Sequence, residues 1–369
     1  MRIPLVDLSW QQREIADEIA VGLSEVIGAT AFIHGPQVGE FEGAFAAFCG
    51  VGNCVGVASG TDALEMAVRA LGIGAGAEVI VPANSFIASA FGVIRAGAKV
   101  KLVDCDPETY LIDVEAVGRA MTPKVAAVMP VHLFGQTAPV EQLSQVVGDL
   151  PIIEDAAQSQ GALRNGSPAG SLGRVAATSF YPGKNIGAYG DAGAVLTDDD
   201  ELAHTVRNLG NWGSPQKYHH PVIGFNSRLD TIQAVILRAK LARLADWNKQ
   251  RRVAAERYAE MLEAGGKVSP PVVLPGNEHV WHLYVIRVPN RDGILASMHA
   301  DGIGVGIHYP IPMHLQGALS FLGHSEGDFP SAETAAREML SLPIYPGITG
   351  EQQEAVIESL HRALDATEG

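Results

Sequence analysis

The residues with the clearest potential for chemistry surround Lys184, in the run Ser179-Phe180-Tyr181-Pro182-Gly183-Lys184-Asn185. A strand is expected to end at Phe180, after which Pro182 and Gly183 turn the chain and present the lysine. A lysine amine forms a Schiff base with a carbonyl cofactor when its surroundings lower its pKa. The simpler interpretation is a solvated surface lysine, and this segment alone favours it.

An apolar strand that ends in acids lies upstream, in the run Ile152-Ile153-Glu154-Asp155-Ala156-Ala157-Gln158. A carboxylate against the pyridine nitrogen of pyridoxal phosphate (PLP) keeps that nitrogen protonated, so the ring can accept electrons. Asp155 suits this contact and Gln158 suits a hydrogen bond to the ring's phenolic oxygen. Strand alternation points Glu154 away from both. The alternative for Asp155 is a helix N-cap.

Two further segments follow strand ends and suit other parts of such a cofactor. The run Ser59-Gly60-Thr61-Asp62 opens a helix, and a helix N-terminus favours an anion such as a phosphate. The same turn also serves as a plain helix cap. Phe86 in VPANSF would stack on a flat ring, although it also fits a core aromatic.

Apolar runs alternate with amphipathic stretches between about residues 50 and 200. The runs predict strands at 54–58, 78–81, 101–103, 125–131, 151–154 and 175–180. The stretches predict helices at 62–71, 87–96, 114–121 and 140–147. Such alternation predicts βαβ units and a mostly parallel sheet, whose functional residues gather at the carboxyl ends of the strands.

The remaining third of the chain has a different pattern. Residues 228–262 carry an apolar stripe at helical spacing, and Ser227 with Asp230 resembles a capping box at its start. From Val280 onward, short strands (283–288, 305–308) and helices (291–299, 332–340, 351–364) are expected. We therefore predict a large domain over residues 1–245 and a smaller α+β domain over 246–369.

Composition excludes several classes of protein. The net charge of −15 disfavours nucleic acid as a partner, so an anionic ligand must be held by local features such as helix N-termini. Cys49, Cys54 and Cys105 form no CxxC pair, and no His, Asp and Glu cluster has metal-ligand spacing, so no disulfide or metal site is expected. With no secretory leader or membrane span visible, the protein is expected to be cytoplasmic and free of membranes.

Taken together and in this order, the segments resemble the nucleotide-sugar aminotransferases, the DegT-type branch of the fold-type-I PLP enzymes. The resemblance covers nearly the whole chain, through PLVDL, GPQVGEFEGAFA, SGTDAL, VPANSF, PVHLFGQ, EDAAQS, SFYPGKN, GDAGAV, GFNSRLDTIQA, WHLY, HYPIP and LSLPIYP. SFYPGKN with the upstream EDAAQ is its most specific part. Ala77 and Ala192 depart from residues common in the family, at positions without a catalytic role.

The resemblance implies a role for each residue around the cofactor. Lys184 would be the Schiff-base lysine and proton shuttle, Asp155 would pair with the pyridine nitrogen, and Gln158 would contact the phenolic oxygen. The phosphate would be held by Gly60, Thr61 and Ser179, and the ring face would be covered by Phe86. Asn226 would reach the cofactor phosphate of a neighbouring subunit, which implies a homodimer with shared active sites. The implied fold is an α/β large domain around a mostly parallel seven-stranded sheet, plus a small C-terminal domain.

The implied activity is transfer of an amino group, from L-glutamate, to a nucleotide-linked keto sugar. Residues 216–220 and 306–312 are similar to the subgroup that aminates C3 of dTDP-linked 3-keto-6-deoxyhexoses or UDP-linked 3-ketosugars; amination at C4 is the alternative. The candidates for the sugar and diphosphate pocket are Tyr181, Tyr218, His219, His220, His308, Tyr309 and His314, although most of them also fit structural roles.

Three other hypotheses compete with this one. A relative that dehydrates deoxysugars has histidine in place of Lys184, and a non-catalytic sensor or binding protein would be expected to lose its catalytic set first. A Rossmann-type dehydrogenase would carry GxGxxG after its first strand, which this chain lacks. His132 and His282 are expected to be interior histidines rather than ligands.

Overall fold

One seven-stranded sheet forms the centre of the computed structural model, which describes residues 2–368. A four-stranded sheet in the order β1-β9-β8-β5 and a three-stranded sheet in the order β3-β2-β4 are joined by parallel bridges from β4 to β5, Val128 to Ile152 and Val131 to Asp155. Only β9 runs antiparallel to its neighbours within this sheet. The strands are β1 (Asn53–Val57), β2 (Glu78–Pro82), β3 (Lys99–Val103), β4 (Val125–Val128), β5 (Ile153–Asp155), β8 (Val175–Ser179) and β9 (Gly193–Thr197).

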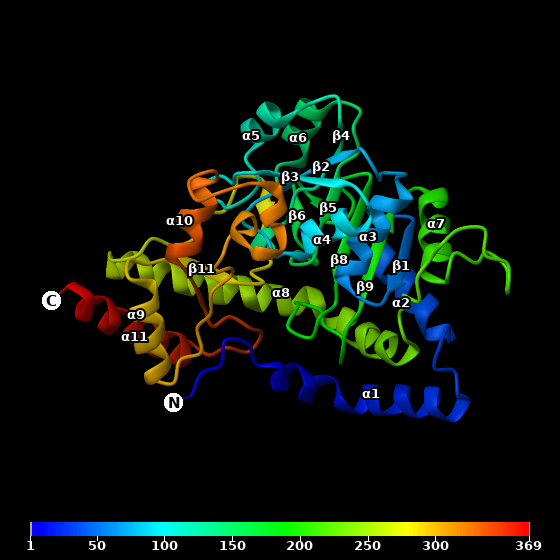
Figure 1. Ribbon diagram of the computed structural model, residues 1–369. Coiled ribbons are helices and arrows are strands. Elements are labelled where there is room, and N and C mark those ends of the chain that lie inside the picture. The colour runs from blue at the N-terminus through cyan, green and yellow to red at the C-terminus, as the bar shows by residue number, and fades with distance from the viewer. Residues whose placement is uncertain (1, 369) are drawn as a thin grey trace.

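Helices cover both faces of this sheet, because successive strand residues point to opposite sides and both sides are apolar. Val57 and Val195 pack against one group of helices, and Cys54 and Ala194 pack against the other. The first group is α3 (Gly60–Ala70), α4 (Ala88–Arg95) and α7 (Asp200–Gly210). The second is α2 (Pro36–Cys49), α5 (Val114–Ala120), α6 (Val140–Val147) and α8 (Thr231–Gly265), with α1 (Leu8–Ala29) packed outside α8 (Figure 1).

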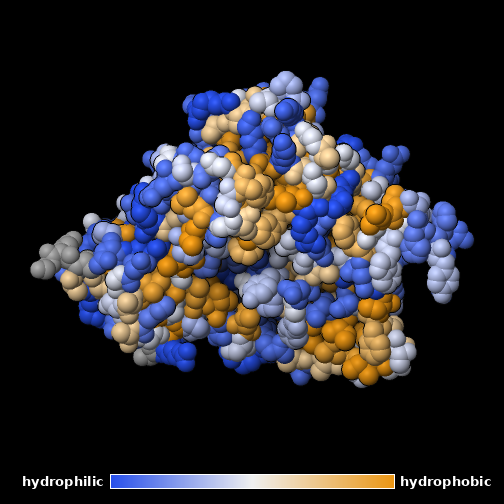
Figure 2. All heavy atoms as spheres, viewed as in Figure 1, coloured by the Kyte–Doolittle hydropathy of each residue, from blue (hydrophilic) through white to orange (hydrophobic). Residues whose placement is uncertain are grey.

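The second half of α8 packs against a smaller group of elements. They are α9 (Arg291–Ala300), α11 (Gly350–Glu368) and the antiparallel pair β11 (Tyr284–Arg287) and β12 (Met339–Leu342). Further short elements are β6 (Leu163–Arg164), β7 (Ser167–Pro168), β10 (Asn277–Glu278), α10 (Pro330–Glu338) and the 3-10 turns η1 (Leu133–Gly135), η2 (Met313–Leu315) and η3 (Gly317–Leu322). Figure 2 shows the face of the molecule hollowed near its centre, over the middle of α8.

The predicted domain boundary at residue 245 falls inside α8, which crosses it without a break. Leu244 belongs to the core of the large sheet, whereas Ala254 belongs to the core of the smaller group. The N-terminal arm, expected to belong with the large domain, has Ile3 buried in the smaller core and bridged to Ile303. The boundary itself stays a prediction.

Several local expectations were wrong. Residues 305–308 form no strand but a single bridge from Gly306 to Ser341, and Leu340 lies in β12 rather than in a helix. Asp230 is the N-cap of α8 but makes no side-chain capping bond. The Ser227 hydroxyl instead accepts a hydrogen bond from Ala58 N and donates to Asp62. The Ser227 side chain is therefore engaged by Ala58 after β1 and by Asp62 of α3, and not by the N-terminus of α8.

None of the helices described between residues 2 and 368 is both long and apolar enough to cross a membrane.

Candidate active site

The loop that follows β8 is closed by its own backbone and presents Lys184. Ala188 N donates to Phe180 O at 2.8 Å, and Lys184 N donates to Tyr181 O at 2.8 Å. The expected turn at Pro182 and Gly183 is therefore present, at the carboxyl end of a central strand. A closed loop of this kind holds the lysine backbone in one place relative to the sheet.

Lys184 carries an amine whose pKa is lowered to about 8. Burial is the larger cause because it disfavours the charged form, and the negative charge of Asp155 acts in the opposite direction. Between residues 2 and 368 no carboxylate lies within ion-pair distance of this amine. The lowered pKa argues against a fully solvated surface lysine, and near neutral pH a fraction of the amine is uncharged.

Asp155 ends β5 next to β8 and is almost completely buried. Ser89 Oγ of α4 donates to its Oδ2 at 2.7 Å, and Ala157 N donates to its Oδ1 at 3.2 Å. Burial raises the pKa of Asp155, while these two hydrogen bonds and the charge of Lys184 act against that rise. The carboxylate is thus fixed in orientation, and among residues 2–368 no cationic side chain lies within ion-pair distance of it.

Glu154 points to the other face of the sheet, as alternation predicted. Its carboxylate bonds His132 Nε2 at 2.7 Å and accepts from the backbone N–H groups of residues 170, 172 and 173. His132 is fully buried, and its Nδ1 accepts from Ala138 N. The pair holds a loop together behind β5, which confirms His132 as an interior histidine.

The N-terminus of α3 lies against the end of β8. A Cβ added to Gly60 would come within 2.6 Å of Ser179 Cβ, so only glycine permits this approach. The Ser59 side chain caps the helix by accepting from Asp62 N at 3.1 Å. The first N–H groups of a helix have no partner within the helix, and they lie here beside the Ser179 hydroxyl. Gly60, Thr61 and Ser179 therefore lie together at one corner, called the Gly60 corner below, and a helix N-terminus of this kind is suited to an anion.

Aromatic and polar groups from the smaller domain reach this region. The Phe86 and Tyr309 rings lie 5.4 Å apart, and Gln158 Nε2 donates to the Tyr309 hydroxyl at 3.1 Å. Gln158 Oε1 accepts from Phe134 N at 2.6 Å, which leaves one amide N–H for a ligand. Burial and the nearby charge of Lys184 lower the pKa of His308 to about 4. Phe86 is half-exposed, so it is no core residue.

Other candidates are not brought to this centre within one chain. The segment between α7 and α8 extends away from the body (Figure 1) and carries Tyr218, His219, His220 and Asn226. Tyr218 is 85% exposed, and Asn226 bridges only to Asn211. Tyr181 belongs to the lysine loop itself, and its side chain is exposed.

His314 is buried and bonds Glu333 at 3.0 Å, so its position fits the structural role considered for it. The roles of all these residues toward a substrate stay predictions.

Two buried groups near the site were missed by the sequence reasoning. Ser89 carried no signal, because a serine in an apolar helix has many uses. Lys240 did carry one, because it falls on the apolar stripe of α8 with Ile236 and Leu244 at helical spacing. Its amine donates to Gly187 O in the lysine loop at 2.6 Å.

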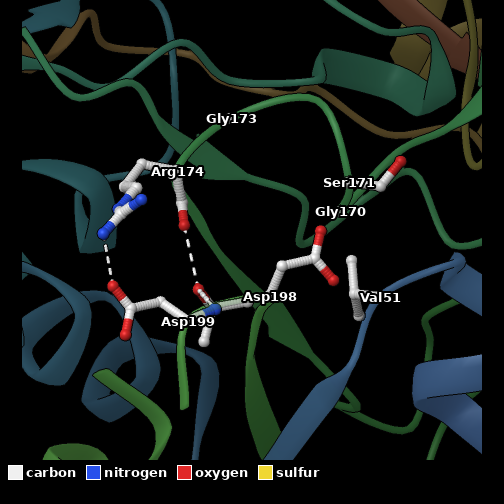
Figure 3. Close-up of a pocket in the computed structure, with 8 residues that line it drawn as sticks. Val51, Gly170, Ser171, Gly173, Arg174, Asp198 and Asp199 are labelled. Carbon is white, nitrogen blue, oxygen red and sulfur yellow. Dashed lines mark hydrogen bonds and ion pairs between the residues drawn. The ribbon is translucent and has the colours of Figure 1, made fainter. Parts of the chain in front are cut away.

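A surface cavity of about 280 Å³ lies at the opposite edge of the sheet (Figure 3). Arg174, just before β8, pairs with Asp199 there, and Thr197 Oγ1 donates to Arg174 O at 3.0 Å. The amino end of β8 borders this cavity, whereas Lys184 follows its carboxyl end. This cavity is therefore not part of the site around Lys184. No group of three or more His, Cys, Asp or Glu side chains among residues 2–368 is arranged to hold a metal ion.

Comparison with known proteins decides the family. The model of the DegT/DnrJ/EryC1/StrS aminotransferase family matches residues 13–361. This chain belongs to that family. The family establishes the activity as PLP-dependent amino transfer and the fold as fold type I, as the sheet order indicates.

Individual relatives match over almost their full length. The chain is 44% identical to a pleiotropic regulatory protein of Geobacillus stearothermophilus and 43% identical to a UDP-N-acetyl-3-dehydro-alpha-D-glucosamine 3-aminotransferase of Acidithiobacillus ferrooxidans. Each match covers 98% of both chains. The crystal structure of Streptomyces venezuelae DesV superposes with a TM-score of 0.95 at 42% identity, again over 98% of both chains.

The residues of this site fit PLP. Asp155 and Lys184 influence each other's pKa without forming an ion pair, the glycine-dependent Gly60 corner is suited to a phosphate, and the half-exposed Phe86 ring is suited to cover a flat ring. When bound, PLP supplies an electrophilic carbonyl and an electron-accepting ring. We assign Lys184 to the covalent attachment, Asp155 to the ring nitrogen and the Gly60 corner to the phosphate; these assignments are proposals.

The pKa of Lys184 predicts how attachment depends on pH. The neutral amine is the reactive form, so a pKa of about 8 means that the attachment rate rises up to about pH 8 and then levels off. An ordinary lysine would still gain reactivity well above that pH. The measurement is the rate at which a visible band forms when PLP is added to the apoprotein at a series of pH values. A rate still climbing at about pH 10 would contradict the lowered pKa.

Proposed function

We propose that the protein transfers the amino group of L-glutamate to C3 of a nucleotide-linked keto sugar, either a dTDP-3-keto-6-deoxyhexose or a UDP-linked 3-ketosugar. The observation that carries the amino transfer is that Lys184 follows β8 and Asp155 ends the neighbouring β5, where each charge influences the pKa of the other group. Relatives from Streptomyces venezuelae, Micromonospora megalomicea and Aneurinibacillus thermoaerophilus are named transaminases of dTDP-3-amino sugars. The Acidithiobacillus relative is named for a UDP-linked 3-dehydro sugar.

The chain's own residues divide the work of such a reaction. Lys184, whose amine has a pKa of about 8, would remove the proton from the donor's α-carbon in the first half-reaction and deliver a proton to the acceptor carbon in the second. Asp155, held by Ser89, would place its carboxylate next to the ring nitrogen and favour the protonated form of that nitrogen. Phe86 and Tyr309 cover the site and limit the access of water. His308 stays neutral at physiological pH, so it accepts or donates a hydrogen bond without adding positive charge.

The experiment that tests this function has two stages. Purified protein loaded with PLP should lose its visible cofactor band when L-glutamate is added without a sugar. The band should return only with a matching acceptor, and we expect 3-keto nucleotide sugars to restore it faster than 4-keto isomers. A faster return with 4-keto sugars would move the proposal to amination at C4. A band that never responds to any amino donor would overturn the function.

The regulatory name of the Geobacillus relative makes a sensor the second candidate. A sensor that kept the fold needs no lysine with a lowered pKa and no buried acid facing it. This chain has both, at Lys184 and Asp155. The glutamate stage of the same experiment separates the two, because a non-catalytic binding protein would leave the band unchanged.

We further propose that the protein acts as a homodimer whose sites are shared. The extended segment between α7 and α8 supports this, because its apolar side chains, such as Ile223 at 94% exposed, have little contact within their own chain. Asn226, Tyr218, His219 and His220 would then reach the partner's site. The proposed location is the cytoplasm.

Mixing two inactive variants tests the shared site. Lys184→Ala and Asn226→Ala are each expected to have little activity, but a mixed dimer contains one site with both native residues. Random reassociation should then restore about a quarter of the wild-type rate. The mixture is compared with each variant alone after the same dissociation step. A mixture no more active than its components would show that Asn226 serves its own subunit.

A further inference from the structure

Lys240 is a second buried lysine close to the active-site loop. It lies on the buried face of α8 and is only 4% exposed. Its Nζ donates to Gly187 O at 2.6 Å and lies 5.0 Å from the centre of the Tyr189 ring. No carboxylate pairs with it among residues 2–368.

Such a lysine costs stability instead of adding it. A buried ammonium without a carboxylate loses its hydration, and one hydrogen bond with one aromatic contact offsets this only in part. The lowering of its pKa to about 8 by burial agrees with that cost. A methionine of similar length would suit the apolar stripe better. A costly residue at a fixed place is expected where function requires it.

The carbonyl that Lys240 holds belongs to the loop of Lys184. Gly187 packs so closely on Pro182 that any side chain there would collide with the Pro182 backbone. The next residue, Ala188, closes the loop through its bond to Phe180 O. Helix α8 therefore fixes one side of the loop through Lys240, while β8 fixes the other. Gln233, two turns earlier on α8, adds a hydrogen bond: its Oε1 accepts from Tyr189 N at 2.8 Å.

We propose that Lys240 is a positioning residue that, by holding the carbonyl of Gly187, aims the Lys184 amine at the cofactor. This inference rests on the proposed role of Lys184. It predicts that loss of the Lys240 amine leaves the fold intact but lets the loop move, so that Lys184 meets PLP less often in a reactive orientation.

The test compares Lys240→Met, Lys240→Arg and the matched control Lys249→Met, an exposed position on the same helix. Three quantities are measured: the thermal midpoint of each apoprotein, its dissociation constant for PLP, and the pH midpoint of PLP attachment. For Lys240→Met we expect an unchanged or higher apoprotein midpoint, a dissociation constant raised at least about tenfold, and a displaced pH midpoint. Lys240→Arg, which keeps a donor, should recover most of the PLP affinity.

Two outcomes would overturn the proposal. A lower apoprotein midpoint in Lys240→Met would make the lysine a structural residue, whatever happens to PLP. Unchanged affinity and pH midpoint would show that the loop needs no support from α8. Neither outcome would contradict the proposed function. The proposed function would be contradicted only if the wild-type protein did not attach PLP at Lys184. Peptide mapping of the reduced wild-type adduct decides that point separately.

Discussion

Lys184→Ala is expected to lower the rate of amino transfer by at least about 10⁴-fold while the fold survives. The change removes both the amine that attaches the cofactor and the group that moves the proton. Lys240, a second buried lysine at this loop, donates to Gly187 O and is therefore a poor substitute for the lost amine. The measurement is the single-turnover rate of the glutamate half-reaction, followed by loss of the visible band.

Stability supplies the control for this variant. Lys184 is partly buried, and its amine has no ion-pair partner between residues 2 and 368, so its removal should not lower the thermal midpoint. Lys249→Ala on the surface of α8 should match wild type in both rate and midpoint. Transfer by Lys184→Ala at near wild-type rate would mean that another group moves the proton, and the assignment of Lys184 would be wrong.

Asp155→Asn is expected to slow the same half-reaction by about 10² to 10³-fold, because it removes a preorganised charge from a buried site. Asparagine keeps the size of the side chain and can still accept from Ser89. What is lost is the negative charge that favours a protonated ring nitrogen. Because Asp155 raises the pKa of Lys184, the pH midpoint of PLP attachment should also move below about 8.

The pKa of Asp155 determines how this variant should affect stability. Burial raises that pKa above its ordinary value, so ionisation is less favourable in the folded protein than in the unfolded one. The charge therefore costs stability increasingly as pH rises through the acidic range. At neutral pH the Asp155→Asn apoprotein should be at least as stable as wild type in a thermal melt.

Ser89→Ala provides a graded comparison for the acid. It removes the 2.7 Å hydrogen bond to Asp155 and lets the pKa of Asp155 rise further, but it leaves the charge in place. Its rate should fall less than that of Asp155→Asn. Equal rates in Asp155→Asn and wild type would show that the ring nitrogen has no need of this acid.

Much of the large domain could be predicted because its signals are local. Apolar runs of strand length alternate with amphipathic helices, and six of the seven sheet strands were placed within a few residues. The missed strand was β9 (Gly193–Thr197), whose apolar run follows a glycine-rich stretch and returns antiparallel. Nothing local distinguishes a returning strand from another parallel one.

The smaller domain was harder to predict because its elements depend on distant partners. Residues 305–308 have a strand-like pattern but find only one bridge, to Ser341, so they remain a loop near the active site. The arm at Ile3 joins this domain through Ile303, at the other end of the chain. Contacts between residues so far apart in the sequence leave no periodic pattern from which they could be predicted.

The amino-acid sequence by itself determined where the residues of this site lie along the chain. Local rules of turns, strands and helix ends place Lys184 after a strand and turn, Asp155 at a strand end and the small residues at Gly60 at the start of a helix. The roles proposed for them toward PLP come from the resemblance to the family. Only the tertiary structure decided what surrounds them: Ser89 on Asp155, Ser179 against Gly60, Tyr309 on Gln158 and Lys240 on Gly187. These pairs join elements that meet because both faces of the sheet must be buried, and the pattern of a single segment does not specify which side chains then come into contact.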